Sequence, residues 1–241
     1  MRRKYSSDNL ITQSLSEYKY YNLISIAFVV CLVVSNIAAV KLCDFLGFAT
    51  LDAGTLTFPL LYVLNDIITE VYGFSASRRT IYIALCSNCF VSGFLWLVAL
   101  MPPAKGWDNQ EAFVQVFSLS PRIVVASISS YFIGELVNST IIASLKIKLE
   151  GKMFVYRAIL STTIGSLIES AIFSYLAFYK IIPGEEILKM IGLLTAIKIA
   201  YEIVIMPVTV RCVSFLKKAE NADVYEKPFT SGFSIINSLK N

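Results

Sequence analysis

The chain has 241 residues, of which 56% are hydrophobic and 16% charged, and its mean hydropathy is +0.66. Soluble domains carry about 25% charged residues, so the composition indicates a membrane protein with little room for a soluble domain. The net charge of +4 is small, and no basic face with interleaved aromatic residues argues for nucleic-acid binding. Histidine is absent, which excludes a Ser-His-Asp enzyme and removes the commonest metal ligand, so we expect neither a metal nor a cofactor.

Apolar stretches long enough to span a bilayer recur along the chain. They fall at about 22–41, 54–73, 80–101, 122–145, 156–180 and 189–216. Because lipid offers the backbone no hydrogen-bond partner, each must be helical. The sequence predicts an all-α, polytopic protein with six transmembrane helices over 22–216, an N-terminal tail at 1–21 and a C-terminal tail at 217–241. The loop after the third stretch fits either a short interfacial helix or a plain loop, and Pro207 is expected to kink the last helix.

The distribution of basic residues predicts the orientation. Cytoplasmic loops of membrane proteins are rich in lysine and arginine. One side of the predicted bundle carries only Lys41, Lys105, Arg122, Lys180 and Lys189, whereas the other lysines and arginines, apart from Lys198, fall on the opposite side. Both termini should therefore be cytoplasmic, and we expect a multi-pass protein of the bacterial inner membrane.

Several ionisable side chains interrupt the apolar stretches. A charge at bilayer depth costs at least about 2.5–3.5 kcal/mol, so such residues usually face a cavity, a partner or a transport path. They therefore favour a transporter over a simple anchor. The residues concerned are Asp66, Glu70, Arg78, Glu135, Glu169, Lys198 and Glu202.

Two pairs of these residues share helix faces. Asp66 and Glu70 are four residues apart and repel each other unless a cation, a proton or a donor-rich ligand lies between them. Simple neutralisation by Arg78, Arg79 or Lys198 is the alternative. Lys198 and Glu202 have the same spacing and could form an intrahelical pair.

Further polar residues extend the candidate site. Glu135 and Asn138 share a face of the fourth helix, and Glu169 follows small residues in the fifth. Asn36 in the first helix either faces a cavity or bonds a neighbouring helix. A carboxylate can accept the two parallel N–H groups of a guanine-like base, and an acidic cavity also suits a cationic amine.

These motifs resemble one family. Ser35-Asn36, then Gly54-x-x-Thr57-Phe58-Pro59, and above all Asp66-x-x-x-Glu70-x-Tyr72-Gly73 are similar to the queuosine precursor transporters, also called the vitamin uptake transporter family. Arg157, Phe173 and Lys198 extend the match. The family usually has glutamine and aspartate where this chain has Glu135 and Asn138, and aspartate in place of Glu169.

The resemblance implies a six-helix carrier, similar in fold to the substrate-binding components of energy-coupling-factor transporters, that imports queuine or other 7-deazaguanine bases. The expected substrate-binding residues are Asn36, Asp66, Glu70, Glu135, Asn138, Glu169 and Lys198. Membrane lipid is an expected partner, nucleic acid is not, and a homo-oligomer stays open.

Three other interpretations stay open. The chain could bind a vitamin or nucleobase and depend on a separate ATPase complex, because it has no nucleotide-binding motif of its own. It could be an intramembrane enzyme, for which Cys86, Cys89 and the acids are the only support. It could be a structural protein held by its charges. Cys86 and Cys89 are otherwise expected to pack between helices.

Overall fold

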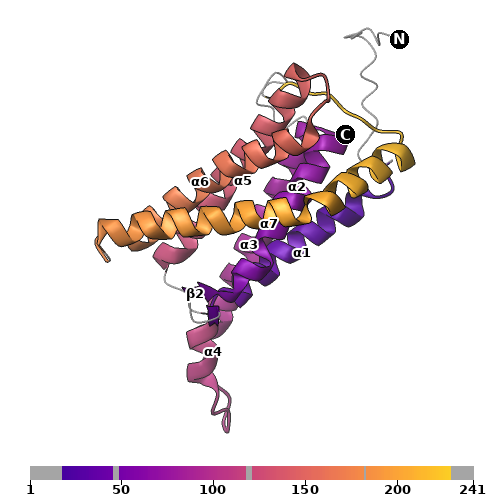
Figure 1. Ribbon diagram of the computed structural model, residues 1–241. Helices are drawn as coiled ribbons and strands as arrows, with labels where there is room; N and C mark the ends of the chain where they lie inside the picture. Colours follow the sequence, from indigo (N-terminus) through magenta and orange to yellow (C-terminus); the bar gives the residue numbers. More distant parts are fainter. Residues whose placement is uncertain (1–17, 46–48, 118–120, 182, 229–241) are drawn as a thin grey trace.

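The computed structural model describes residues 18–45, 49–117, 121–181 and 183–228 (Figure 1). The remaining parts of the predicted tails, 1–17 and 229–241, lie outside the described residues. Long helices dominate the structure: α1 (Tyr21–Ala38), α2 (Phe58–Tyr72), α3 (Phe74–Ala99), α5 (Pro121–Lys148), α6 (Phe154–Phe178) and α7 (Gly184–Ala219). Each corresponds to one predicted stretch, so the prediction of a helical membrane protein is confirmed.

Two smaller features occupy the loops. The loop after α3 contains the short helix α4 (Gln110–Phe117), which confirms the helical alternative for that segment. Between α1 and α2 the strands β1 (Leu42–Phe45) and β2 (Ala49–Asp52) form an antiparallel hairpin, followed by a 3₁₀ turn, η2 (Ala53–Leu56). The hairpin adds two short strands to an otherwise helical structure and lies between two predicted stretches, 22–41 and 54–73.

The helix α2 differs from the others. Among the described residues, five helices are long and apolar enough to cross a membrane, namely α1, α3, α5, α6 and α7. The helix α2 has 15 residues, or about 22 Å at 1.5 Å per residue, against roughly 30 Å of hydrocarbon. Nearly all its side chains are buried, so α2 lies inside the bundle. It ends at Gly73, whose φ of +89° suits glycine and allows α3 to begin at once.

The bundle has two distinct ends. We call the end where α1 begins and α7 stops the terminal end, and the opposite end, with β1 and β2, the hairpin end (Figure 1). At the terminal end the carboxylate of Glu220 accepts hydrogen bonds from the backbone N–H groups of Lys19 (3.1 Å) and Tyr20 (2.6 Å). It thereby caps the start of α1, where backbone donors have no partner within the helix.

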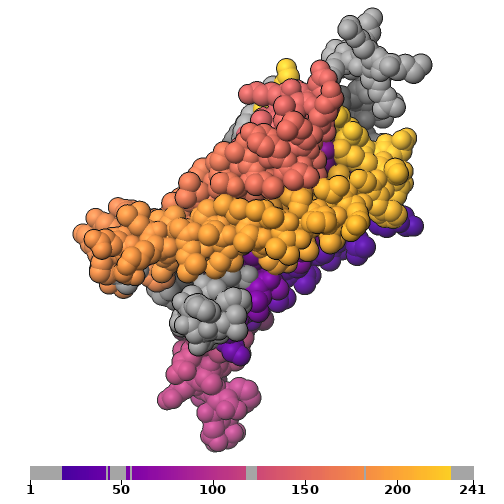
Figure 2. Space-filling view, viewed as in Figure 1, coloured from indigo at the N-terminus to yellow at the C-terminus, as the bar shows by residue number. Residues whose placement is uncertain are grey.

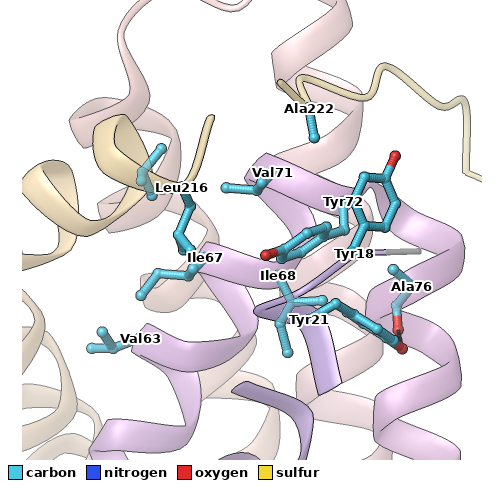
Figure 3. Packing of buried hydrophobic residues seen from close by; sticks show 11 residues of the cluster. Tyr18, Tyr21, Val63, Ile67, Ile68, Val71, Tyr72, Ala76, Leu216 and Ala222 are labelled. Atoms are coloured by element: carbon cyan, nitrogen blue, oxygen red, sulfur yellow. Dashed lines mark hydrogen bonds between the residues drawn. The ribbon is translucent and has the colours of Figure 1, made fainter. Parts of the chain in front are cut away.

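The segment 220–226, here called the C-terminal strap, crosses this end. The N–H of Val224 donates to the carbonyl of Val71, and the carboxylate of Glu226 accepts from the N–H of Ser75 (2.7 Å). A hydrophobic cluster lies beneath it, in which the rings of Tyr18 and Tyr21 meet Tyr72 edge-on (Figure 3). The strap therefore joins the ends of α1, α2, α3 and α7.

The outer surface of the helices is apolar. Val204 on α7 is 78% exposed and Phe90 on α3 is 72% exposed, as expected for side chains that face lipid. Figure 2 shows α7 running along one whole side of the molecule. The helix continues through Pro207 without interruption. Figure 1 likewise draws α7 as one continuous helix.

Candidate functional site

A cavity of about 110 Å³ lies in the half of the bundle nearer the hairpin end. The helices α1, α2, α5, α6 and α7 all contribute to its wall. The wall combines two aromatic rings, an amide, several hydroxyl groups and one acid–base pair. These polar and aromatic groups belong to Ser35, Asn36, Phe58, Ser127, Ser130, Glu169, Ser170, Phe173 and Lys198.

An ion pair forms the charged part of the wall. The ammonium group of Lys198 lies 2.6 Å from Oε2 of Glu169, and the hydroxyl of Tyr62 donates to the same oxygen. Lys198 also lies over the rings of Phe58 and Tyr62, at 5.1 and 5.4 Å from their centroids. Both described bonds of the carboxylate use Oε2, which leaves Oε1 available to a ligand.

Asn36 fulfils both of its predicted alternatives. It lines the cavity and also binds a neighbouring helix, because its Nδ2 donates to Oδ1 of Asn88 on α3 (3.1 Å) as well as to the carbonyl of Leu32 in its own helix (3.0 Å). Its Oδ1 accepts from the hydroxyl of Ser127 at 3.3 Å. The amide is therefore fixed in orientation by α1, α3 and α5.

Two glycines set the position of Glu169. A Cβ built on Gly134 would lie 2.7 Å from Cβ of Glu169, and one on Gly165 would lie 3.0 Å from Cβ of Asn138. The absence of these side chains lets α5 and α6 approach closely, as small residues do between membrane helices. The close contact places the Glu169 carboxylate at the cavity.

Below the cavity lies a buried polar layer that does not line it. Nδ2 of Asn138 donates to Oδ1 of Asp66 (2.7 Å), and Nδ2 of Asn65 donates to Oε2 of Glu135 (2.6 Å). Glu202 on α7 is buried, and both its carboxylate oxygens lack a described partner. The alternative of a Lys198–Glu202 pair is wrong, because Lys198 reaches Glu169 instead.

Glu70 lies further away, in a group that we call the terminal ion cluster. Arg157 holds its carboxylate through two bonds, and Lys217 adds a third at 2.6 Å. Lys217 also pairs with Asp223 of the C-terminal strap (2.8 Å), as does Lys146 (2.7 Å). Glu70 is thus neutralised, but not by Arg78, Arg79 or Lys198 as the sequence alternative had it.

The terminal ion cluster also fixes the charge state of Asp223. Partial burial by itself would raise the pKa of this carboxyl, but the hydrogen bonds and charges of Lys146 and Lys217 hold the pKa below its usual value. The strap is therefore bound through an ionised Asp223.

The structure brings together three of the seven predicted site residues, Asn36, Glu169 and Lys198, and places the other four outside the cavity wall. The roles of Lys146 and Lys217 could not be predicted from the sequence, because both lie near helix ends and look like ordinary loop cations. Cys86 and Cys89 are exposed, so the expectation that they pack between helices is wrong.

A bundle of long helices with apolar outer faces, five of them long and apolar enough to span a membrane among the described residues, defines the class: a multi-pass membrane protein. Residues 52–212 match the family model described as "Putative vitamin uptake transporter". The chain therefore belongs to the vitamin uptake transporter family, as its motifs predicted. No solved structure matches the chain.

Three curated bacterial proteins are similar to it. A "Probable queuosine precursor transporter" of Bacillus subtilis is 22% identical over 73% of this chain and 76% of its own length. A protein of the same name from Haemophilus influenzae is 26% identical over 53% and 52% of the two chains. The "Queuosine precursor transporter" of Escherichia coli is 20% identical over 71% of this chain and 74% of that one.

Proposed function

We propose that this protein imports a 7-deazaguanine precursor of queuosine, such as queuine, by binding the base in the cavity beside Glu169. The observation that carries the proposal is a buried carboxylate with one oxygen available, placed in a cavity that also presents the rings of Phe58 and Phe173. The names of the relatives from three bacteria give the substrate class. The chain acts as a carrier and not as an enzyme.

The chemistry of the cavity suits such a base. A guanine-like edge presents an N1–H and an exocyclic amine, and a carboxylate has lone pairs enough to accept both while keeping Lys198 and Tyr62. The aromatic rings offer faces for a planar bicycle. Asn36 and the neighbouring hydroxyls would bond the other polar edge of the ring.

The topology belongs to the same proposal. We place six spans across a bacterial inner membrane, with α2 completing its crossing through η2 and the hairpin, and with both tails (1–21 and 217–241) in the cytoplasm. The contact between Glu220 and the start of α1 supports termini on one side, and the lysine and arginine distribution supports the cytoplasmic side. The cavity then opens in the outer half of the membrane.

The predicted residues outside the cavity take later roles in this scheme. Asp66, Glu135 and Asn138 lie deeper along α2 and α5, where a base would pass after the helices rearrange. Glu70 helps to close the cytoplasmic side through the terminal ion cluster in the conformation described here. We still expect membrane lipid, and not nucleic acid, as a partner of the protein. Whether it forms a homo-oligomer stays an open question.

Uptake by purified protein in liposomes tests the proposal. Labelled queuine should enter vesicles that contain the wild type, and Glu169→Gln should reduce uptake at least tenfold, because the base loses its charged acceptor. Lys189→Met is the matched control, since Lys189 pairs with Glu186 on the exposed start of α7. The proposal is wrong if the wild type transports no deazaguanine, or if Glu169→Gln transports normally. Uptake without any added ATPase would also exclude dependence on a separate energising complex.

A further inference from the structure

The charged side chains that meet inside the described part of the bundle fall into two groups. One group has an excess of cations and the other an excess of acids. The terminal ion cluster has three cations, Lys146, Arg157 and Lys217, for the two acids Glu70 and Asp223. The layer around and below the cavity has four acids, and within the described residues the one cation bonded to any of them is Lys198. These acids are Asp66, Glu135, Glu169 and Glu202.

Lys198 cannot serve all four acids, because its ammonium group is already bonded to Glu169. Glu202 is 1% exposed and Asp66 is 0% exposed. Oδ2 of Asp66 and both oxygens of Glu202 lack any described hydrogen-bond partner. An ionised carboxylate without partners in a water-free interior is costly, so these groups call for neutralisation.

Asp66 and Glu202 lie on α2 and α7, two helices that pack against each other. Both carboxyl groups are buried in the bundle with oxygens that lack a described partner. The other charged groups that α2, α5, α6 and α7 bring to this region are Glu70, Glu135, Lys146, Arg157, Glu169, Lys198 and Lys217. The helix α1 has no Asp, Glu, Lys or Arg, and α3 has Arg78 and Arg79 near its start, with Arg78 over the ring of Phe74.

We propose that Asp66 and Glu202 together bind the proton that drives import, at a site separate from the cavity that holds the base. The proposal rests on the proposed function, since the driven step is the uptake of that base. The amide of Asn138 donates to Oδ1 of Asp66, so the proton resides on Oδ2 of Asp66 or on Glu202. One proton on these two buried carboxyl groups removes a charge and supplies a hydrogen-bond donor where the unpartnered oxygens lack one.

A proton fits this site better than a metal ion. Among the described residues no group of three or more acidic, cysteine or histidine side chains comes together as a metal site would require. Hard cations such as Ca²⁺ take about six to eight oxygen ligands, whereas the pair offers two carboxyl groups.

The location explains how the proton would act on transport. The helices α2 and α7 carry the pair and also line the cavity, through Phe58 on α2 and Lys198 on α7. Protonation of the pair and binding of the base therefore act on the same two helices. We place the coupling at the α2–α7 contact, which can shift only when its facing charges are neutralised.

The transport test uses full-length protein in liposomes with an inside-alkaline gradient of about one pH unit. One proton coupled to each base raises accumulation of labelled queuine up to about tenfold per pH unit. Asp66→Asn and Glu202→Gln should abolish this stimulation, and Glu202→Gln, which lies off the path of the base, should still exchange labelled for unlabelled base without a gradient. Glu185→Gln, at an exposed acid in the first turn of α7, is the control and should keep the full stimulation. Stimulation that survives in both site variants overturns the proposal.

A second measurement does not need the base. Infrared spectra of the folded wild type at neutral pH should contain a protonated-carboxyl band that shifts in D₂O, and each site variant should lose part of it. An unchanged band in both variants overturns the proton site. If no labelled base enters liposomes at all, the proposed function fails, and the infrared comparison alone decides whether the pair holds a proton.

Discussion

Arg157 and Glu70 form a two-pronged ion pair in the interior of the protein, with N–O distances of 2.6 and 3.1 Å and side chains that are 0% and 1% exposed. The planar guanidinium matches both carboxylate oxygens at once. The pair joins α6 to α2, and Lys217 adds α7. This contact closes the terminal end of the bundle, opposite the cavity.

Glu70→Gln should destabilise the protein by about 3–5 kcal/mol, because it leaves the buried Arg157 without a counter-charge. Unfolding in detergent, followed by circular dichroism against denaturant, measures the change. The double variant Glu70→Leu with Arg157→Met should recover most of the loss, since the fully buried guanidinium is removed with its partner and Lys217 keeps its pair with Asp223. Equal instability of the single and double variants would contradict this account.

Gly134→Ala should reduce both stability and base binding. The added Cβ would meet Cβ of Glu169 at 2.7 Å, so α5 and α6 must separate and carry the carboxylate out of place. We expect a loss of about 1–3 kcal/mol. Gly192→Ala on α7 is the control: nothing lies within 4 Å of the new Cβ, and the higher helix propensity of alanine should leave stability unchanged or raised. Thermal unfolding with and without base compares the two.

Tyr62→Phe should weaken base binding at least about tenfold, because its hydroxyl helps to hold Oε2 of Glu169 and a hydrogen bond to a charged group contributes about 1.5–3 kcal/mol. Equilibrium binding of labelled base to purified protein measures this loss. Tyr175→Phe, at an exposed tyrosine on the same helix as Glu169, should bind like the wild type. If the Tyr62→Phe protein bound the base with unchanged affinity, the hydroxyl of Tyr62 would not contribute to base binding.

Asp223→Asn should lower the Tm by about 1–4 °C near neutral pH, since a partly exposed ion pair contributes about 0.2–1 kcal/mol. The folded protein lowers the pKa of Asp223, so the stabilisation is fully present above the unfolded pKa of about 4 and disappears as the pH falls through the folded pKa. The Tm difference from wild type should therefore be constant from about pH 8 to 5 and narrow below about pH 4. If the Tm difference between Asp223→Asn and the wild type narrowed near neutral pH, a titratable group other than Asp223 would cause the pH dependence.

The sequence predicted the long helices well, because apolar runs such as 156–180 have few structural alternatives in a membrane. It did less well at 54–73, where the start of the predicted span is a 3₁₀ turn and the helix begins only at Phe58. The ends of elements depend on turn geometry and on neighbours that are distant in sequence, such as the strap that packs on Gly73.

The sequence identified the ionisable residues within the apolar stretches as candidates for function, but it did not predict which residues they pair with. The i, i+4 spacing made Glu202 the natural partner of Lys198, yet the partner is Glu169, 29 residues away. Lys146, Arg157 and Lys217 looked like loop cations because they lie near helix ends, and they are buried only because α2, α5, α6 and α7 converge there. Such long-range pairings depend on helix packing, which local patterns do not encode.

The C-terminal strap has a practical consequence for work on this protein. Glu220 and Glu226 anchor it to the starts of α1 and α3, and Val224 anchors it to the end of α2. An affinity handle or fluorescent reporter fused directly to the end of α7 would displace these anchors and loosen four helix ends together. Fusions that leave residues 220–228 intact and add a flexible spacer should preserve the native bundle.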